Sequence, residues 1–525
     1  MSKCVLASIL ILILCTTATT VNASIDELFD GYSDSTPGCS IAASHNSEVI
    51  FSKSYGMANL EHNVPLTSLS VFNVASVSKQ FTAAAVAMLI LEGKLELDTR
   101  IVDHFPELGA MHSEVTIEHL VRHTSGIRDY IPLLIMRGQD WDDSRSNEEL
   151  LSLIAAQRRL NFTPGAEWEY SNSGYILLAW LVEKVSGKRF GEYVAEKIFE
   201  PAGMKVSWFR TDYRVIPNRA TDYEKEDGWV HVFSRETVAG DGALHTTPTE
   251  LLKWHDYLYS TRGEPLRKLM HQVGKFNNGL DVNYAFGIGL GERSGLGTVS
   301  HGGSTGGYRS FLLRIPSERF SVAVACNRSD ANPYRIAAGV SSALLNGFEI
   351  VHSEYPLRSV SEYVGSYEFF PGNHIKYETR ESRLYKTDSV APLLAIGEDK
   401  FLDTEDFEYI HFVRNADGEV IAVRRTDFGR PREHKKVGGE IEFDRSEYLG
   451  TYYSASLDAR YTFSLDGGDL YCSVAFAEPR KVIARADDDL EAFGRRFRFV
   501  RGEDGKLSGF DLDGYRVRNI SFVKE

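Results

Sequence analysis

The sequence has few of the features that mark disulfide-rich, metal-binding or nucleic-acid-binding proteins. It has only five cysteines among 525 residues, and they lack the paired spacing of a zinc site: Cys4, Cys15, Cys39, Cys326 and Cys472. Long basic runs are also missing, and the formal net charge of −15 gives no electrostatic footprint for nucleic acid. We therefore expect no metal, no cofactor and no nucleic-acid partner.

Long apolar runs are missing after the first few residues. The single early run, from Val5 to Leu14, follows Lys3 and precedes small polar residues that end at Ala23. It is too short to cross a bilayer, and Leu14 before Cys15 is too bulky for lipoprotein processing. We expect residues 1–23 to be a cleaved signal peptide and the mature chain to be secreted or periplasmic, without a transmembrane segment. A membrane anchor is the alternative interpretation.

The remaining composition is that of a globular protein, because 43% of the residues are hydrophobic and 25% are charged. The pattern over residues 24–350 mixes strands with helices. Alternation predicts strands over 40–55 and 300–327, and helical periodicity predicts helices over 77–91, 148–160, 173–185 and 333–345. These segments predict one α/β domain.

After Gly347 the sequence changes to short alternating segments separated by Asp-Gly and Gly-Gly turns, which predicts all-β structure. Two landmarks recur there in the same order. The segment 361–367, SEYVGSY, returns as SEYLGTY at 446–452, and the FVR that precedes Asp417-Gly418 returns before Asp504-Gly505. We expect two small barrel-like β modules, 356–440 and 441–525, the second a repeat of the first.

The first chemical motif is Ser76-Val77-Ser78-Lys79, at the start of the predicted helix 77–91. Ser76 and Lys79 are three residues apart and share a helical face. A serine hydroxyl is a poor nucleophile until a neighbouring group takes its proton, and a desolvated lysine can assist. Alone the motif is also typical of a helix cap followed by a solvated lysine.

Two further motifs follow in order. They are Tyr170-Ser171-Asn172, before an apolar helix, and His301-Gly302-Gly303, at the start of the strand region. Together with the Ser-x-x-Lys motif, they make residues 24–347 resemble the penicillin-binding proteins and class C β-lactamases. With two C-terminal β modules, the architecture is most similar to D-aminopeptidase. The resemblance implies an antiparallel sheet flanked by helices, with an all-helical subregion.

The resemblance also implies roles for these residues. Ser76 would be the nucleophile, and Lys79 and Tyr170 would transfer protons, with the Tyr170 pKa lowered by the nearby lysine. Asn172 would orient the substrate and Lys79. The backbone N–H groups of Ser76 and Ser304 would form an oxyanion hole.

The triplet His301-Gly302-Gly303 departs from the Lys-Thr-Gly of many relatives. His301 and Gly303 would line the substrate site, but the triplet lacks a permanent positive charge and the threonine hydroxyl. A carboxylate-bearing β-lactam should therefore bind less well than a small uncharged ester or a D-amino-acid amide.

Two other patterns have competing interpretations. Gly302-Gly303-Ser304-Thr305-Gly306 matches the nucleophile elbow of α/β-hydrolases, but the residues after it predict a strand, whereas an elbow requires a helix. His119 and His123 could share a metal on one helical face, but no third ligand lies beside them. We interpret both histidines as structural.

Cleavage after Ala23 would leave Cys39, Cys326 and Cys472, an odd number that we interpret as three small buried side chains. The resemblance adds a different possibility for two of them. It would place the strand that starts near Cys39 antiparallel to the one that ends at Cys326, within reach of a disulfide. The pairing stays open at the level of sequence.

The sequence therefore predicts an exported serine hydrolase that forms an acyl-enzyme at Ser76 with small peptide, amide or ester substrates, as D-aminopeptidases do. A class C-type β-lactamase or D-Ala carboxypeptidase is one alternative, and a non-catalytic penicillin-recognising sensor is another. The resemblance further implies that a loop of the second module reaches the active site, and the hairpin at Gly467-Gly468 is our candidate for it. The oligomeric state stays open.

Overall fold

The computed structural model describes residues 25–525 except 141–142, 235–236, 346–347, 349–354, 358, 388, 390, 404–407, 428–429 and 476. The expected signal peptide, residues 1–23, lies outside the described residues. Within the described part, none of the helices combines the length and the apolar character that a membrane crossing requires.

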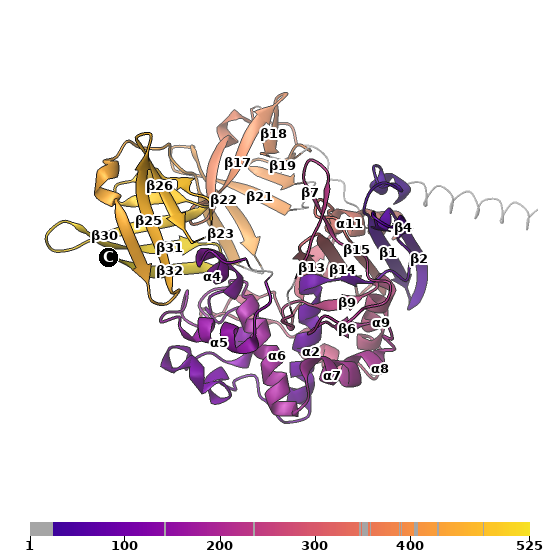
Figure 1. The fold of residues 1–525 in the computed structure, drawn as a ribbon. Coiled ribbons are helices and arrows are strands. Elements are labelled where there is room, and N and C mark those ends of the chain that lie inside the picture. The colour runs from indigo at the N-terminus through magenta and orange to yellow at the C-terminus, as the bar shows by residue number, and fades with distance from the viewer. Residues whose placement is uncertain are drawn as a thin grey trace, which may run out of the picture.

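The catalytic-type domain is built on a six-stranded antiparallel sheet in the order β12-β13-β14-β15-β1-β2 (Figure 1). The first two strands of the chain therefore join strands from its middle. The bounds are β1 (Cys39–His45), β2 (Glu48–Tyr55), β12 (Gly289–Arg293), β13 (Leu296–Thr305), β14 (Tyr308–Ile315) and β15 (Phe320–Cys326). The strands expected over 40–55 and 300–327 are confirmed.

Helices cover both faces of this sheet, which explains why β15 is buried at every position. On one face, α11 (Pro333–Leu344) packs against β14 and β15, and on the other α9 (Pro248–Leu258) packs against β1 and β15. The alternation is visible in β1, where Ile41 faces the α11 side and Ala42 faces the opposite core.

The all-helical subregion lies below the sheet in Figure 1 and packs around α2. Its elements are α2 (Lys79–Leu91), α3 (Ile117–Val121), α4 (Tyr130–Met136), α5 (Asn147–Ala155), α6 (Asn172–Ser186) and α7 (Phe190–Val194). Helices α2 and α6 lie against each other, and their first residues, Lys79 and Asn172, are joined by a hydrogen bond. The expected fold class, a helix-flanked antiparallel sheet with a helical subregion, is confirmed.

A disulfide joins β1 to β15. Cys39 lies directly opposite Cys326 in the strand register, and their sulfur atoms are bonded. Cys472 is buried and free. The interpretation of all three cysteines as free side chains is therefore wrong for the first two, because strand pairing brings residues 287 positions apart into contact.

The segment after the catalytic-type domain forms two successive antiparallel sheets joined through Tyr367 and Lys436. The first has three strands and the second has five. Their bounds are β16 (Gly365–Phe370), β17 (Asn373–Arg380), β18 (Arg383–Lys386), β19 (Leu394–Gly397), β20 (Lys400–Asp403), β21 (Glu408–Arg414), β22 (Val420–Asp427) and β23 (Arg430–Lys435).

The C-terminal segment forms one nine-stranded, nearly barrel-shaped sheet in the order β27-β26-β25-β24-β32-β31-β30-β29-β28. Aromatic side chains fill its interior. The bounds are β24 (Gly450–Ser454), β25 (Ala459–Asp466), β26 (Asp469–Val474), β27 (Arg480–Lys481), β28 (Ile483–Ala486), β29 (Asp489–Ala492), β30 (Arg495–Arg501), β31 (Leu507–Gly514) and β32 (Val517–Lys524).

The landmarks that repeat in the sequence form the same polar cluster twice. In the first segment, Asp399 accepts hydrogen bonds from the Tyr363 hydroxyl at 2.9 Å and from Arg414 at 2.7 Å. In the second, Asp488 accepts them from the Tyr448 hydroxyl at 3.1 Å and from Arg501 at 2.7 Å. The tyrosine comes from the SEY landmark and the arginine from the FVR landmark, so the repeat marks one interaction that is built twice.

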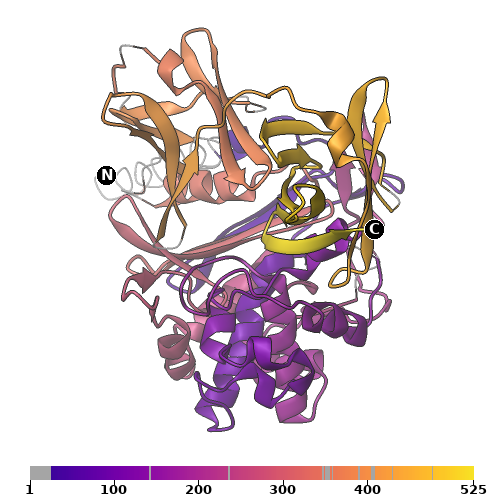
Figure 2. The same ribbon diagram turned by 90° about the vertical axis from the view of Figure 1, so that its left-hand side faces the viewer.

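The two β segments differ in how they contact the rest of the chain. The second shares a continuous hydrophobic core with the helical subregion, and its Tyr461 hydroxyl donates to the Met136 carbonyl at 2.8 Å. The first has a separate core. Figure 2 shows the second segment, in yellow, directly above the helices, whereas the first, in orange, lies farther from them.

Candidate active site

Ser76 lies in a single 3-10 turn, Ala75–Ser78, and Lys79 begins α2 immediately after it. The helix expected from residue 77 thus starts with a tighter turn. The Lys79 Nζ lies 3.2 Å from the Ser76 Oγ. Ala75, with φ of +47°, adopts a left-handed backbone conformation that is uncommon for residues other than glycine. Such conformations cost energy and concentrate at functional sites.

Lys79 is fully buried, and its ammonium group faces three acceptors. Besides the Ser76 hydroxyl, it donates to the Asn172 Oδ1 at 2.8 Å and to the Asp241 backbone oxygen at 2.6 Å. An ammonium group has three N–H donors, so these contacts fit the charged form of the lysine. A buried charge needs such partners.

Asp129 fixes the orientation of the Asn172 amide. Its carboxylate, which is fully buried, accepts from the Asn172 Nδ2 at 3.0 Å and from the Ile131 backbone N–H at 3.2 Å, which caps α4. Because the amide nitrogen faces Asp129, the amide oxygen faces Lys79. Sequence reasoning gave Asp129 no role.

The Tyr170 hydroxyl is buried and, within the described residues, makes no hydrogen bond of good geometry. Burial is the largest influence on its pKa and raises it, while Ser76 and Arg516 lower it. The expectation that this pKa is lowered is wrong, because burial outweighs the influences that lower it. The Lys79 Nζ lies 4.8 Å from the centre of the tyrosine ring, over its face, and is directed at other acceptors.

His301 is uncharged near neutral pH, because burial and the Lys79 charge lower its pKa to about 4. Its Nδ1 is 2.6 Å from the Gly302 carbonyl oxygen, and its Nε2 is 2.8 Å from the Tyr284 hydroxyl. A carbonyl oxygen can only accept, so Nδ1 carries the proton and Nε2 accepts from Tyr284. The strand therefore presents no positive charge at this position.

Strand β13 lies against the serine turn at Gly303. A Cβ atom at this position would overlap the Val74 carbonyl oxygen and lie 3.1 Å from the Ser76 backbone nitrogen. Only glycine allows this approach. Ser304 follows on the same strand, and Thr305 pairs with Tyr308 across a turn into β14. A strand rather than a helix follows, which rules out a nucleophile elbow at Ser304.

A pocket of about 750 Å³ lies over Ser76. Six of the seven sequence-predicted site residues line it: Ser76, Tyr170, Asn172, His301, Gly303 and Ser304. The seventh, Lys79, contacts the Ser76 hydroxyl. Tyr515 and Arg516 also line it. The hairpin that reaches the site is thus the one between β31 and β32, and the choice of Gly467-Gly468 is wrong.

The sequence model of the β-lactamase family matches residues 25–346, well over half of the chain. The chain belongs to the β-lactamase family. It is accordingly an enzyme of the serine hydrolase type. A D-aminopeptidase of Gluconobacter oxydans is 28% identical to it over 457 residues, which cover 83% of each chain.

Two solved structures share the fold of this β-lactamase family member. One is the octameric penicillin-binding protein homologue from Pyrococcus abyssi, with 20% identity and a TM-score of 0.54 over 94% of this chain and 99% of that one. The other is a D-stereospecific amidohydrolase from Streptomyces sp., with 21% identity and a TM-score of 0.51 over 62% of this chain and 98% of that one. The first comparison extends the shared architecture across both β segments.

Neither His119 nor His123 lies in a metal site. His119 accepts from the Thr116 backbone N–H at 3.2 Å and so helps to cap α3. The His123 Nδ1 accepts from the Ser171 N–H at 3.1 Å, and its ring centre is 4.2 Å from that of Tyr170. The part of the chain that the structure describes holds no group of three or more metal-ligating side chains. His123 instead packs against Tyr170.

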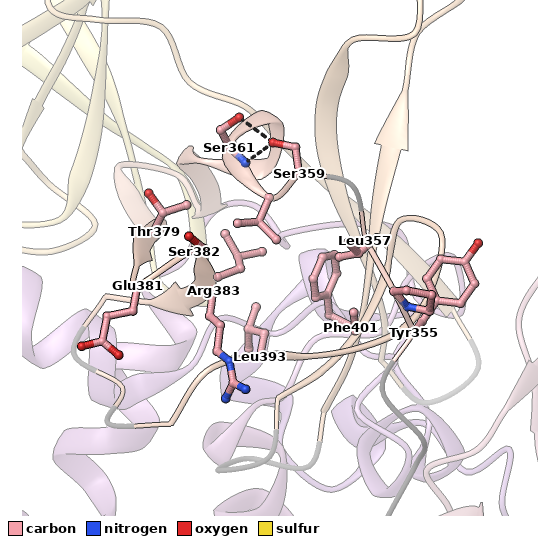
Figure 3. Close-up of a pocket in the computed structure, with 14 residues that line it drawn as sticks. Tyr355, Leu357, Ser359, Ser361, Thr379, Glu381, Ser382, Arg383, Leu393 and Phe401 are labelled. Atoms are coloured by element: carbon pink, nitrogen blue, oxygen red, sulfur yellow. Dashed lines mark hydrogen bonds between the residues drawn. The ribbon is translucent and has the colours of Figure 1, made fainter.

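A second pocket, of about 740 Å³, lies in the first β segment, away from Ser76 (Figure 3). Its lining combines the apolar side chains of Leu357, Leu393 and Phe401 with the charged side chains of Glu381 and Arg383. These residues include no serine-lysine pair. Of these two pockets, only the one over Ser76 is lined by the serine of a serine-lysine contact.

Proposed function

We propose that this chain is an exported D-aminopeptidase-like hydrolase that forms an acyl-enzyme at Ser76 with small peptides, amides or esters. The observation that carries the proposal is the 3.2 Å contact between the Lys79 Nζ and the Ser76 Oγ beneath a pocket that could hold a small substrate. The D-aminopeptidase relative, which aligns across most of both chains, supports this substrate class.

In the proposed acylation, the Ser76 Oγ attacks the acyl carbon and gives its proton to the Tyr170 oxygen. Because burial holds the Tyr170 pKa high, the tyrosine would pass its own proton to the leaving group in the same step and never become a free phenolate. The Lys79 ammonium would balance the developing negative charge. Water would then hydrolyse the acyl-enzyme.

The remaining predicted residues would bind the substrate. The backbone N–H groups of Ser76 and Ser304 would hold the oxyanion, and Gly303 permits their approach by leaving room beside the serine turn. The Asn172 amide and the neutral His301 would line the acyl side. A neutral histidine supports amides and esters over substrates whose binding needs a carboxylate anchor.

We further propose the domain limits 24–350 for the catalytic domain, 356–440 for the first β module and 441–525 for the second. The duplicated Tyr-Asp-Arg cluster supports the two-module division. Export rests on the pattern of residues 1–23. N-terminal sequencing of the protein recovered outside the cytoplasm should start at Ser24, whereas a start near Met1 would contradict a cleaved signal.

The test of function is a burst experiment. A p-nitrophenyl ester should release a stoichiometric burst of nitrophenol, and intact mass should show one acyl group on the wild-type protein and none on Ser76→Ala. A panel of D- and L-amino-acid amides then tests the substrate class, with D-amino-acid amides expected to be hydrolysed faster. Equal rates for both series would contradict the D-aminopeptidase-like substrate class, and faster cephalosporin hydrolysis would favour the β-lactamase alternative. A Ser76 adduct that never turns over would favour the sensor alternative.

A further inference from the structure

One side chain of the second β module reaches the catalytic residues. Arg516 lies in the turn between β31 and β32, and its Nη1 donates to the Asp129 Oδ2 at 3.0 Å. Its guanidinium carbon lies 4.5 Å from the centre of the Tyr170 ring. Arg516 is 387 residues from Asp129 in sequence, so the contact depends on how the module is docked.

We propose that Arg516 is a positioning residue for the reaction at Ser76, and this inference rests on the proposed function. The connection runs through one carboxylate and one amide. Arg516 and the Asn172 Nδ2 both donate to the Asp129 Oδ2, each at 3.0 Å. The Asn172 Oδ1 then accepts from Lys79 at 2.8 Å. An amide has a donor side and an acceptor side, so holding one side at Asp129 directs the other to the lysine.

The charges in this connection alternate. Lys79 and Arg516 are cations on either side of the Asn172 amide and the Asp129 carboxylate. The Asp129 side chain is completely buried. A buried carboxylate that loses its cation is strongly destabilised, so loss of Arg516 should rearrange Asp129 and release the amide.

Side chains of the catalytic domain hold the Arg516 turn in place through hydrogen bonds to its backbone. The Asn161 Nδ2 donates to the Arg516 carbonyl at 2.9 Å, and the Asn161 Oδ1 accepts from the Arg518 N–H at 2.9 Å. Arg128 donates to the Arg518 carbonyl at 2.7 Å. Arg516 itself has a φ of +57°, a conformation that glycine or asparagine adopts more readily. The guanidinium is thus presented from a turn that the catalytic domain fixes.

Arg516 also acts on Tyr170 directly. The Lys79 Nζ and the Arg516 guanidinium both lie within 5 Å of the centre of the tyrosine ring, at 4.8 Å and 4.5 Å. The Arg516 charge is one of the influences that oppose the burial-raised pKa of this hydroxyl. Removing it should make the tyrosine a weaker proton donor. Both effects predict a slower chemical step rather than weaker substrate binding.

The test compares Arg516→Met with Arg518→Met. Arg518 belongs to the same hairpin and pairs with Glu169 at 3.0 Å, but it does not line the pocket over Ser76. For a small p-nitrophenyl ester we expect Arg516→Met to lower kcat and the Ser76 acylation rate by about 10- to 100-fold with little change in KM. Arg518→Met also takes the cation from a buried carboxylate of the catalytic domain, Glu169, but this pair does not contact the catalytic residues, so kcat should stay within about threefold of wild type.

Two further variants separate positioning from folding. Arg516→Lys keeps the charge without the planar fork and should recover part of the lost kcat. In the Asp129→Asn background, Arg516→Met should cost much less than in wild type, because the partner of the arginine is already altered.

The outcomes are distinct. If Arg516→Met acylates Ser76 at the wild-type rate, the inference fails while the proposed function stands. If wild type itself forms no acyl-enzyme, both fail. If Arg516→Met does not fold, the comparison moves to Arg516→Lys and Arg518→Met, and equal kcat losses in these two would overturn a positioning role.

Discussion

Gly303 lies so close to Ser76 that a Cβ atom on the glycine would be 3.1 Å from the serine backbone nitrogen and would overlap the Val74 carbonyl. We therefore expect Gly303→Ala to displace β13 from the serine turn and widen the oxyanion hole. The loss in kcat should be about 100-fold or more.

Gly297 offers a matched control for this change. It lies on the same strand, with open space around its Cβ position and no left-handed backbone. Gly297→Ala should keep wild-type kcat. Equal losses for the two variants would mean that β13 tolerates no added methyl group anywhere, and the close approach at Gly303 would carry no special weight.

Ser76→Ala should abolish the covalent route and lower kcat by about 10⁴- to 10⁶-fold. Ser304→Ala should lose far less, because it removes only a hydroxyl and keeps the backbone N–H that we assign to the oxyanion hole. Steady-state kinetics with a p-nitrophenyl ester measures both. An inactive Ser304→Ala together with an active Ser76→Ala would show that Ser76 is not the nucleophile.

The disulfide predicts a specific thiol count. The protein that lacks residues 1–23, denatured without reductant, should show one thiol, from Cys472, and three after reduction. Cys472→Ala should show none before reduction. Three thiols in the unreduced wild type would contradict the bond between Cys39 and Cys326. Replacing Cys326 by alanine should lower the free energy of unfolding by about 2–5 kcal/mol.

Buried histidines predict a loss of stability in mild acid. Burial lowers the pKa to about 4 for His301 and His271 and to about 3 for His245, below the 6.5 of an unperturbed histidine. As pH falls below 6.5, the unfolded chain binds these protons and the folded chain does not, so the free energy of unfolding should decrease until about pH 4. Each histidine contributes at most about 1.4 kcal/mol per pH unit.

Urea unfolding between pH 4.5 and 7.5 measures this slope. His245→Gln should flatten it relative to wild type, because glutamine binds no proton in either state. An identical slope in the two proteins would contradict a contribution from His245.

The neutral His301 predicts the substrate preference. Penicillins and cephalosporins should be hydrolysed poorly compared with uncharged p-nitrophenyl esters or D-amino-acid amides, because β13 offers their carboxylate no permanent positive charge. The ratio of kcat/KM values for the two substrate classes measures this preference. Efficient cephalosporin turnover by wild type would contradict it.

The sequence predicted those features that depend on local spacing. The serine and lysine meet because three residues separate them on one helical turn, and the β segments were recognised because the SEY and FVR landmarks recur in order. Contacts between residues far apart in the sequence could not be predicted from local spacing. Asp129 and Arg516 are ordinary charged residues in sequence, and only docking of the second module brings them together.

The sequence also did not show which side chains are buried or which hairpin contacts the active site. The Tyr170 pKa was misjudged because the sequence does not show that its hydroxyl is buried, and burial outweighs the influences that lower the pKa. Gly467-Gly468 and Tyr515-Arg516 are both hairpin turns, and glycine content pointed to the first. Turn residues locate a hairpin, but only the orientation of the barrel decides which hairpin faces the active site.

The continuous core shared by the helical subregion and the second module bears on cooperativity. A unit that unfolds as one is defined by shared buried surface, and here that unit joins residues from both ends of the chain. The first module, with its separate core, interrupts this unit in sequence but not in space. We therefore expect the helical subregion to reach its full stability only when the second module has folded against it.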